Sequence, residues 1–131
     1  MGFESIFRPG LFAGETHVVT GGGSGIGRCT AHEIAALGAH VAITGRKADK
    51  LATVKGEIEA SGGSCETHAF DIREEAQVKD AIAAIVAKNG RIHGLFNNAG
   101  GQFPSPAATM SAKGFDVVVR NNLTGGFIVS R

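Results

Sequence analysis

The sequence feature that most constrains the fold is a glycine-rich turn between a predicted strand and a predicted helix. Residues 21–27 read GGGSGIG, directly after the β-branched run THVVT at 16–20 and before a helical pattern from Gly25 to Leu37. Glycine allows a tight turn and a close backbone approach to a ligand, and a helix N-terminus attracts phosphate. The spacing is G-x-x-x-G-x-G rather than G-x-G-x-x-G. We expect a diphosphate cradle here, the alternative being a merely flexible turn.

Strand-like and helix-like segments alternate along the chain. Further strands are predicted at 40–44, 65–70 and 92–97, and further helices at 48–61 and 74–88. Such alternation predicts an α/β fold, a Rossmann-type doubly wound parallel sheet. Ligands of such sheets bind outside the carboxyl ends of the strands, so we expect the loops after these strands to meet along one edge. A last helix is predicted from Ser111 past Asn122, despite the β-branched run at 117–119.

The end of the second predicted strand indicates which dinucleotide fits. An acidic residue there would bind the ribose 2′-hydroxyl and repel a 2′-phosphate. The sequence instead has Gly45-Arg46-Lys47. A guanidinium binds phosphate through two hydrogen bonds and stacks on adenine, so we expect NADP(H) rather than NAD(H). The alternative is a solvated basic pair at a helix start.

Charge and composition exclude several other classes. With 13 basic and 12 acidic side chains the net charge is +1, which argues against a nucleic-acid partner. No two of the five histidines have the spacing of a metal-ligand pair, so no metal site is expected. We interpret Cys29 and Cys65 as ordinary reduced thiols. The sequence shows no apolar run long enough for a membrane span and no secretory signal, so a cytoplasmic location is expected.

Four motifs in order resemble the short-chain dehydrogenase/reductase family. They are Thr20-Gly21-x-x-x-Gly25-Ile26-Gly27, Asp71-Ile72, Asn97-Asn98-Ala99-Gly100 and Asn122-Leu123-Thr124-Gly125. The resemblance implies a role for each matching position. The turn would bind the pyrophosphate, and Arg46 would bind the 2′-phosphate. Asp71 and Ile72 would contact the adenine, and Asn97 would help to hold the sheet together. The residues expected at the pyrophosphate are Gly21, Gly23, Ser24, Gly25, Ile26 and Gly27, and those expected at the ribose are Asn98, Ala99 and Gly100.

Asn122 matches the asparagine of the family's catalytic tetrad, which anchors a water in a proton relay. Its neighbour Asn121 is the rival position, and a polar residue that bends the helix is the alternative. The loop at 97–107 and the segment 111–115 are similar to NADPH-dependent trans-2-enoyl-CoA reductases of the peroxisomal type. That likeness implies that Gln102 and Phe103 shape the substrate mouth. Alcohol and aldehyde dehydrogenases for terpenoid or fatty substrates carry similar loops, and a proline-stiffened turn is the plain alternative.

The chain contains no tyrosine. Enzymes of this family supply a proton to the substrate from a tyrosine in a Tyr-x-x-x-Lys pattern, where the lysine lowers the pKa of the tyrosine. We therefore expect an incomplete dinucleotide-binding domain at 16–131 that lacks the C-terminal catalytic half and is inactive alone. Residues 1–15 show no periodicity and are expected to form an N-terminal arm. The expected whole is an NADP-dependent oxidoreductase that reduces 2-enoyl-CoA-type or carbonyl substrates and forms a homo-oligomer. The alternatives are an alcohol dehydrogenase for a hydrophobic alcohol and a non-catalytic nucleotide-binding module.

Overall fold

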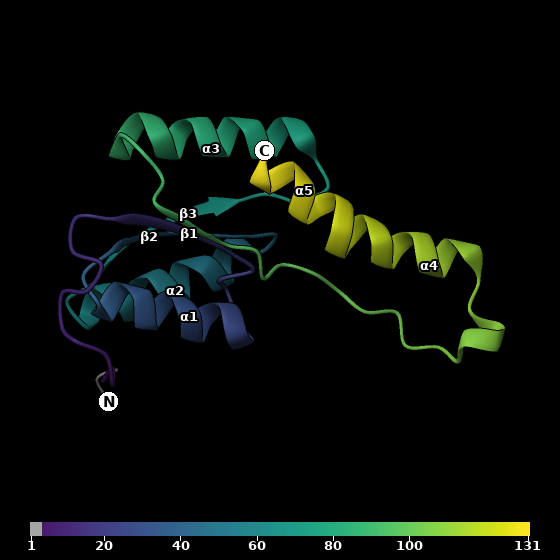
Figure 1. The fold of residues 1–131 in the computed structure, drawn as a ribbon, viewed down its shortest axis with the longest axis horizontal. Coiled ribbons are helices and arrows are strands. Elements are labelled where there is room, and N and C mark those ends of the chain that lie inside the picture. The colour runs from purple at the N-terminus through teal and green to yellow at the C-terminus, as the bar shows by residue number, and fades with distance from the viewer. Residues whose placement is uncertain (1–3) are drawn as a thin grey trace.

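A four-stranded parallel sheet forms the centre of the molecule in the computed structural model, which describes residues 4–131. The first three residues of the predicted N-terminal arm lie outside this range. The strand order is β3-β2-β1-β4, which confirms the predicted doubly wound α/β sheet (Figure 1). The strands are β1 (Thr16–Thr20), β2 (His40–Gly45), β3 (Ser64–Ala69) and β4 (Gly94–Phe96).

Helices cover both faces of the sheet. The helices α1 (Gly25–Ala36) and α2 (Ala48–Ala60) lie on one face, and α3 (Glu75–Asn89) lies on the other (Figure 1). Alternate side chains of a strand point to opposite faces. Val19 and Ile43 therefore pack with Leu51 of α2, while Val18 packs with Ile85 of α3. Burial on both faces explains why β1 and β2 are mostly apolar residues and threonine rather than alternating patterns.

The C-terminal segment is helical from Ala112 to Ser130, so the predicted helix past Asn122 is observed and continues beyond the glycine pair. It consists of α4 (Ala112–Val119), a single π-turn η2 (Arg120–Thr124) and α5 (Gly125–Ser130). Ser111 caps α4 by accepting a hydrogen bond from the N–H of Gly114. The helix continues through the glycine pair, and Gly125 lets it pack closely on Ile72, where a Cβ would lie 2.6 Å from Cδ1. Turns of the π type are frequent at functional sites.

A buried carboxylate attaches the end of α3 to the sheet. Glu66 of β3 accepts hydrogen bonds from Lys88 Nζ (2.7 Å) and Asn89 Nδ2 (3.0 Å), both at the end of α3. The imidazoles of His40 and His68 flank the same carboxylate at 3.5 Å. Burial by itself raises the pKa of Glu66, but the bonds and charges of its partners, Lys88 first, lower it below the ordinary value.

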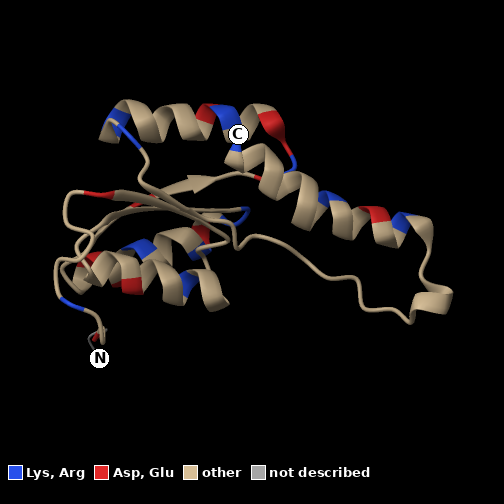
Figure 2. Ribbon diagram, in the orientation of Figure 1, with Lys and Arg blue, Asp and Glu red and all other residues tan. Residues whose placement is uncertain are grey.

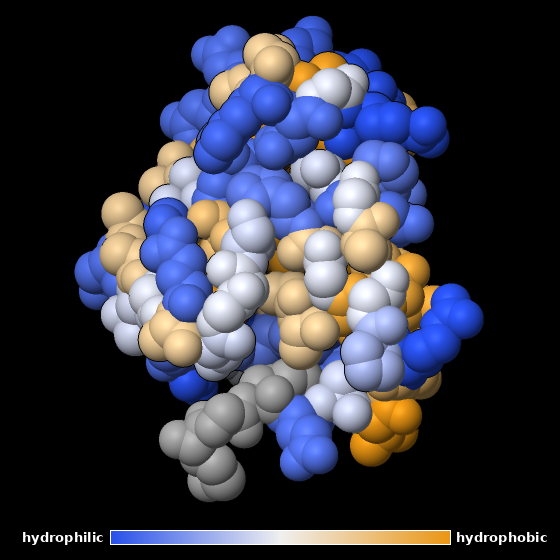
Figure 3. Space-filling model, turned by 90° about the vertical axis from the view of Figure 1, so that its left-hand side faces the viewer, coloured by the Kyte–Doolittle hydropathy of each residue, from blue (hydrophilic) through white to orange (hydrophobic). Residues whose placement is uncertain are grey.

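The outer surface carries charges of both signs. Basic and acidic residues are interspersed along the helices (Figure 2). The N-terminal segment exposes Ile6, Phe7 and Leu11. Figure 3 shows an apolar patch at the lower right of the molecule. Within residues 4–131, no helix combines the length and the apolar character that a membrane crossing requires. The same part of the chain shows no cluster of three His, Cys, Asp or Glu side chains that could hold a metal ion.

Candidate functional site

A groove of about 580 Å³ lies at the carboxyl ends of the strands. Loops that follow all four strands contribute to it, which confirms that these loops lie along one edge of the sheet. Its walls come from the glycine turn after β1, the β2–α2 junction, the segment after β3 and the loop after β4. The lining residues are Gly21, Gly23, Ser24, Gly45, Arg46, Lys47, Lys50, Leu51, Phe70, Asp71, Ile72, Asn98, Ala99, Gly100, Gly101, Gln102 and Asn121.

The glycine turn packs closely against the neighbouring strand β2. The N–H of Gly22 donates to the carbonyl of Thr44 (3.0 Å), and a Cβ on Gly22 would lie 2.7 Å from Ile43 Cβ. Gly21 has a φ of +69°, which only glycine adopts without strain. A side chain at either position would therefore push the turn away from β2 or strain its backbone.

The turn leads directly into the N-terminus of α1. Ser24 is the N-cap residue, and its side chain makes no capping hydrogen bond to the helix. The N–H groups of the first turn thus lack a side-chain acceptor, which leaves them available to an anion. Of the residues predicted to hold a pyrophosphate, Gly21, Gly23 and Ser24 line the groove, whereas Gly25, Ile26 and Gly27 are not among the lining residues. Gly27 lies behind the turn, where a Cβ would overlap the carbonyl oxygen of Gly21.

A hydrogen-bond network joins the ends of β1 and β4. Thr20 Oγ1, which is buried, accepts bonds from the N–H groups of Asn98 (3.0 Å) and Ala99 (2.9 Å). It also donates to the carbonyl of Phe96 (3.4 Å). In the other direction, Asn98 Nδ2 donates to the carbonyl oxygen of Thr20 (3.0 Å) and to that of Gly21 (3.4 Å). The network fixes the loop after β4 against the glycine turn.

The prediction that Asn97 ties the sheet was wrong by one residue. Asn97 Nδ2 donates to Ser130 Oγ of α5 (2.7 Å), and Asn98 makes the bonds to β1. Thr20, which is central to this network, was identified only as part of a motif and not as a site residue. A threonine at a strand end is an ordinary β-former, so the sequence carries no separate signal for this role.

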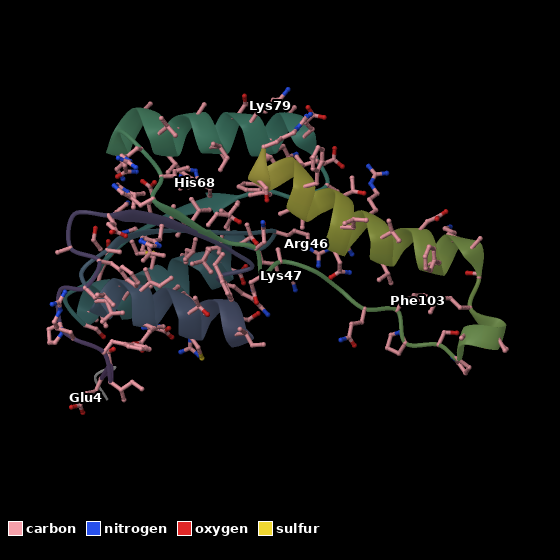
Figure 4. All side chains as sticks on the ribbon, in the orientation of Figure 1. Glu4, Arg46, Lys47, His68, Lys79 and Phe103 are labelled. Atoms are coloured by element: carbon pink, nitrogen blue, oxygen red, sulfur yellow. The ribbon has the colours of Figure 1, made fainter. Side chains whose placement is uncertain are left out.

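Three cations surround the part of the groove beside β2. Arg46, Lys47 and Lys50 all line it, and Arg46 and Lys47 lie at the ends of the strands in Figure 4. Across from them, Asp71 is ion-paired with Arg73 at 2.6 Å. The hydrogen bond from Arg73, with smaller contributions that include the charge of Arg46, lowers the pKa of Asp71 to about 2. The groove therefore combines a surplus of positive charge with one paired carboxylate.

The π-turn fixes the loop that forms the far wall of the groove. Asn122 Nδ2 donates to the carbonyls of Gly101 (2.7 Å) and Val118 (2.9 Å), and Asn122 Oδ1 accepts from the N–H of Gly101 (3.3 Å). A Cβ on Gly100 would collide with the Asn122 side chain. The structure thus places Asn122 against the loop backbone, and its rival Asn121 lines the groove.

The two residues expected at a substrate mouth are placed differently from each other. Gln102 lines the groove. The ring of Phe103 instead packs on Gly114 of α4, where a Cβ would lie 2.8 Å from the ring, and Figure 4 shows it between the loop and α4. Phe103 therefore attaches the loop to the helix and, unlike Gln102, does not line the groove.

Comparisons with known proteins agree with this geometry. A family model described as short chain dehydrogenase matches residues 15–131. A protein of Bacillus subtilis (strain 168) named "Probable 2,4-dienoyl-CoA reductase" is 36% identical over 114 residues, which cover 87% of this chain and 45% of that protein.

Solved structures of a dehydrogenase and of a short-chain oxidoreductase are also similar to this chain. The citronellol catabolism dehydrogenase AtuB of Pseudomonas aeruginosa PAO1 is 63% identical with a TM-score of 0.93, covering 98% of this chain and 53% of that one. A metagenomic short-chain oxidoreductase in complex with NADP is 36% identical with a TM-score of 0.84. The match covers 91% of this chain and 54% of that one. The chain spans about half the length of the relatives it matches.

Proposed function

Because the chain belongs to the short-chain dehydrogenase family, we propose that residues 16–131, behind an arm at 1–15, are the NADP(H)-binding domain of an oxidoreductase. The observation that supports this most is the groove, which brings together the glycine turn, Arg46 and the Asn98–Gly100 loop. When bound, the nicotinamide supplies or accepts the hydride. The contribution of this chain is to bind and orient the dinucleotide.

The glycine turn and the start of α1 have the properties of a diphosphate site. The turn cannot accommodate side chains at Gly22 or Gly27 without moving, and the helix begins without a side-chain cap. We propose that Gly21, Gly23, Ser24, Gly25, Ile26 and Gly27 form this cradle through their backbone. Asp71 and Ile72 would hold the adenine, and Asn98, Ala99 and Gly100 would border the ribose.

Arg46 is proposed to bind the 2′-phosphate of NADP(H). We expect that Arg46→Ala weakens NADPH binding by about tenfold or more, because a charge-assisted hydrogen bond is lost. The same substitution should change NADH binding by less than about twofold, because NADH has no 2′-phosphate. Isothermal titration of both coenzymes against both proteins measures this difference. Arg91→Ala, which removes an exposed arginine outside the groove lining, is the matched control. Unchanged NADPH affinity in Arg46→Ala would remove the basis for the NADP preference.

Proton transfer requires groups that this chain does not contain. The sequence has no tyrosine, and of the family's catalytic tetrad only Asn122 has a matching position. We propose that Asn122 fixes the Gly101 backbone and so contributes to the proton relay of the whole enzyme.

Purified residues 1–131 are expected to show neither steady-state oxidation of NADPH with enoyl-CoA or carbonyl substrates nor reduction of NADP+ with an alcohol, because they contain no tyrosine to transfer the proton. Absorbance of the reduced nicotinamide over time measures this. A buffer blank and the same assays with a full-length member of the family acting on its own substrate are the controls. Turnover above the blank would contradict the proposal that proton transfer requires groups that this chain does not contain.

Two substrate classes are supported for the whole protein. Similarity to 2,4-dienoyl-CoA reductases supports the reduction of 2-enoyl-CoA-type substrates. The 63% identity to a dehydrogenase named for citronellol catabolism supports a hydrophobic alcohol or its carbonyl product, and this is the higher of the two identities. Activity assays with both substrate classes, on a complete protein that contains this chain, show which class it uses. A chain that binds NADPH but never assembles with a catalytic half would instead be a nucleotide-binding module.

A further inference from the structure

A histidine side chain joins the start of β4 to the start of β1. The N–H of Thr16, the first residue of β1, donates a hydrogen bond to Nδ1 of His93 (2.9 Å). In the other direction, the backbone N–H of His93 donates to the carbonyl of Thr16 (2.8 Å). His93 directly precedes Gly94, the first residue of β4. We call this pair of hydrogen bonds the His93–Thr16 contact.

The His93–Thr16 contact requires a neutral imidazole. A backbone N–H can only donate, so Nδ1 of His93 must present its lone pair to Thr16, and the ring proton is then on Nε2. A second proton, on Nδ1, would place two N–H groups against each other. Thr16 is 5% exposed, so little water reaches its N–H to replace the lost acceptor. His93 itself is exposed and takes up protons from solvent.

The strand that follows His93 has few attachments to the rest of the sheet. β4 is three residues long and lies at one edge of the described sheet, beside β1. At its carboxyl end, the bonds of Thr20 Oγ1 hold it to β1. At its amino end, the His93–Thr16 contact does so. The loop that leaves β4 forms one wall of the groove, so a change at the start of the strand can reach that wall.

Other titratable groups lie on the elements around His93, and several have partners of their own. They are Glu15 and His17 at the start of β1, His40 at the start of β2, Lys88 at the end of α3 and Arg91 in the loop before β4. His17 Nε2 lies 2.7 Å from Glu15 Oε2, Lys88 donates to Glu66, and His40 Nδ1 lies 2.6 Å from Ser64 Oγ. The ring of His17 also packs on Gly94, so this second imidazole needs its own control.

We propose that His93 is a pH-sensitive switch in which the neutral ring holds β4 to β1 and the protonated ring releases it. Imidazole side chains take up a proton near about pH 6.5. Because the bond to Thr16 exists only with the neutral ring, the stability that it contributes is present above this range and is lost as the pH falls through it. Release of β4 loosens the loop at the groove, and NADPH binding weakens as a consequence. This last step rests on the proposed function.

Amide hydrogen exchange of Thr16 tests the switch without coenzyme. After correction for the intrinsic exchange rate, protection of this amide proton in the wild-type chain should fall about fivefold or more between about pH 7.5 and about pH 5.5. In His93→Asn it should stay within about twofold, because Asn Oδ1 can accept the same bond and does not titrate in this range. His93→Leu, which has no acceptor, should show low protection at both pH values. The control His17→Gln should keep the wild-type pH dependence.

Nitrogen chemical shifts of the His93 ring test the same claim in the wild-type chain alone. We expect the proton on Nε2 and an unprotonated Nδ1 at about pH 7.5. A proton on Nδ1 at that pH would overturn the proposal. Thr16 protection that does not change with pH, or a His93→Asn chain that loses protection as the wild type does, would overturn it as well.

NADPH titration at the same two pH values tests the connection to the groove. The loss of affinity on acidification should be about threefold or more greater in the wild type than in His93→Asn, and this comparison removes the titration of the coenzyme's own phosphate. An equal loss in both proteins would overturn the connection between His93 and the groove. A wild-type chain that binds no NADPH at about pH 7.5 would overturn the proposed function, whereas the exchange experiment would still decide the switch.

Discussion

Replacing Gly27 with alanine is expected to lower the free energy of unfolding by about 3 kcal/mol and to weaken NADPH binding by at least about tenfold. The added Cβ would overlap the carbonyl oxygen of Gly21 and lie 2.5 Å from Asn98 Nδ2. A backbone carbonyl cannot rotate aside as a flexible side chain can, so α1 must separate from the turn. The N-terminus of α1 would then no longer point its N–H groups at the diphosphate.

Gly56→Ala is the matched control for this substitution. Gly56 lies within α2, and a Cβ there would meet nothing within 4 Å. Alanine is the better helix former, so this variant should be more stable than the wild type by about 0.5–1 kcal/mol and bind NADPH normally. Urea denaturation followed by circular dichroism measures both stabilities. A Gly27→Ala protein as stable as the wild type would show that α1 does not pack on the turn as described.

Thr20→Val is expected to lower the free energy of unfolding by about 2 kcal/mol, although it preserves shape. Valine cannot accept the hydrogen bonds that Thr20 Oγ1 receives from Asn98 and Ala99. The N–H of Ala99 would then lose its partner beside the groove. Because these bonds fix the loop after β4, NADPH binding should also weaken, by about tenfold. Chemical denaturation and NADPH titration check the two effects.

Thr44→Val provides a control on the neighbouring strand. Thr44 pairs in register with Thr20, is fully buried, and its Oγ1 has no hydrogen-bond partner in the described part of the chain. Removing a buried hydroxyl without a partner should leave stability unchanged or raise it. Equal destabilisation by Thr20→Val and Thr44→Val would refute the role assigned to the Thr20 network, since the effect would then follow from burial alone.

The parts of the fold that depend on repeating patterns could be predicted from the sequence. The predicted β1 at 16–20 has the observed bounds, and the predicted start of α1 at Gly25 is also the observed one. Parallel topology then brings Ser24, Arg46, Asp71 and Asn98 to one edge, because strand ends of a parallel sheet share an edge. Periodicity and the glycine spacing were sufficient for this.

The contacts between distant side chains could not be predicted in the same way. Whether Asn97 or Asn98 faces β1 depends on how the strand ends, and the observed β4 is only three residues long. The packing of Phe103 on Gly114 depends on the path of a loop that has no periodicity. The Asp71–Arg73 pair is local, but a charged pair two residues apart has no fixed geometry until the turn after β3 is formed.

We propose above all that the glycine turn and the first turn of α1 bind the diphosphate of NADP(H). A crystal structure of the chain with NADPH tests this most directly. We expect diphosphate oxygens about 3 Å from backbone nitrogens of residues 21–27, with the 2′-phosphate at Arg46. A diphosphate bound anywhere else on the protein, with the glycine turn left free, would contradict it.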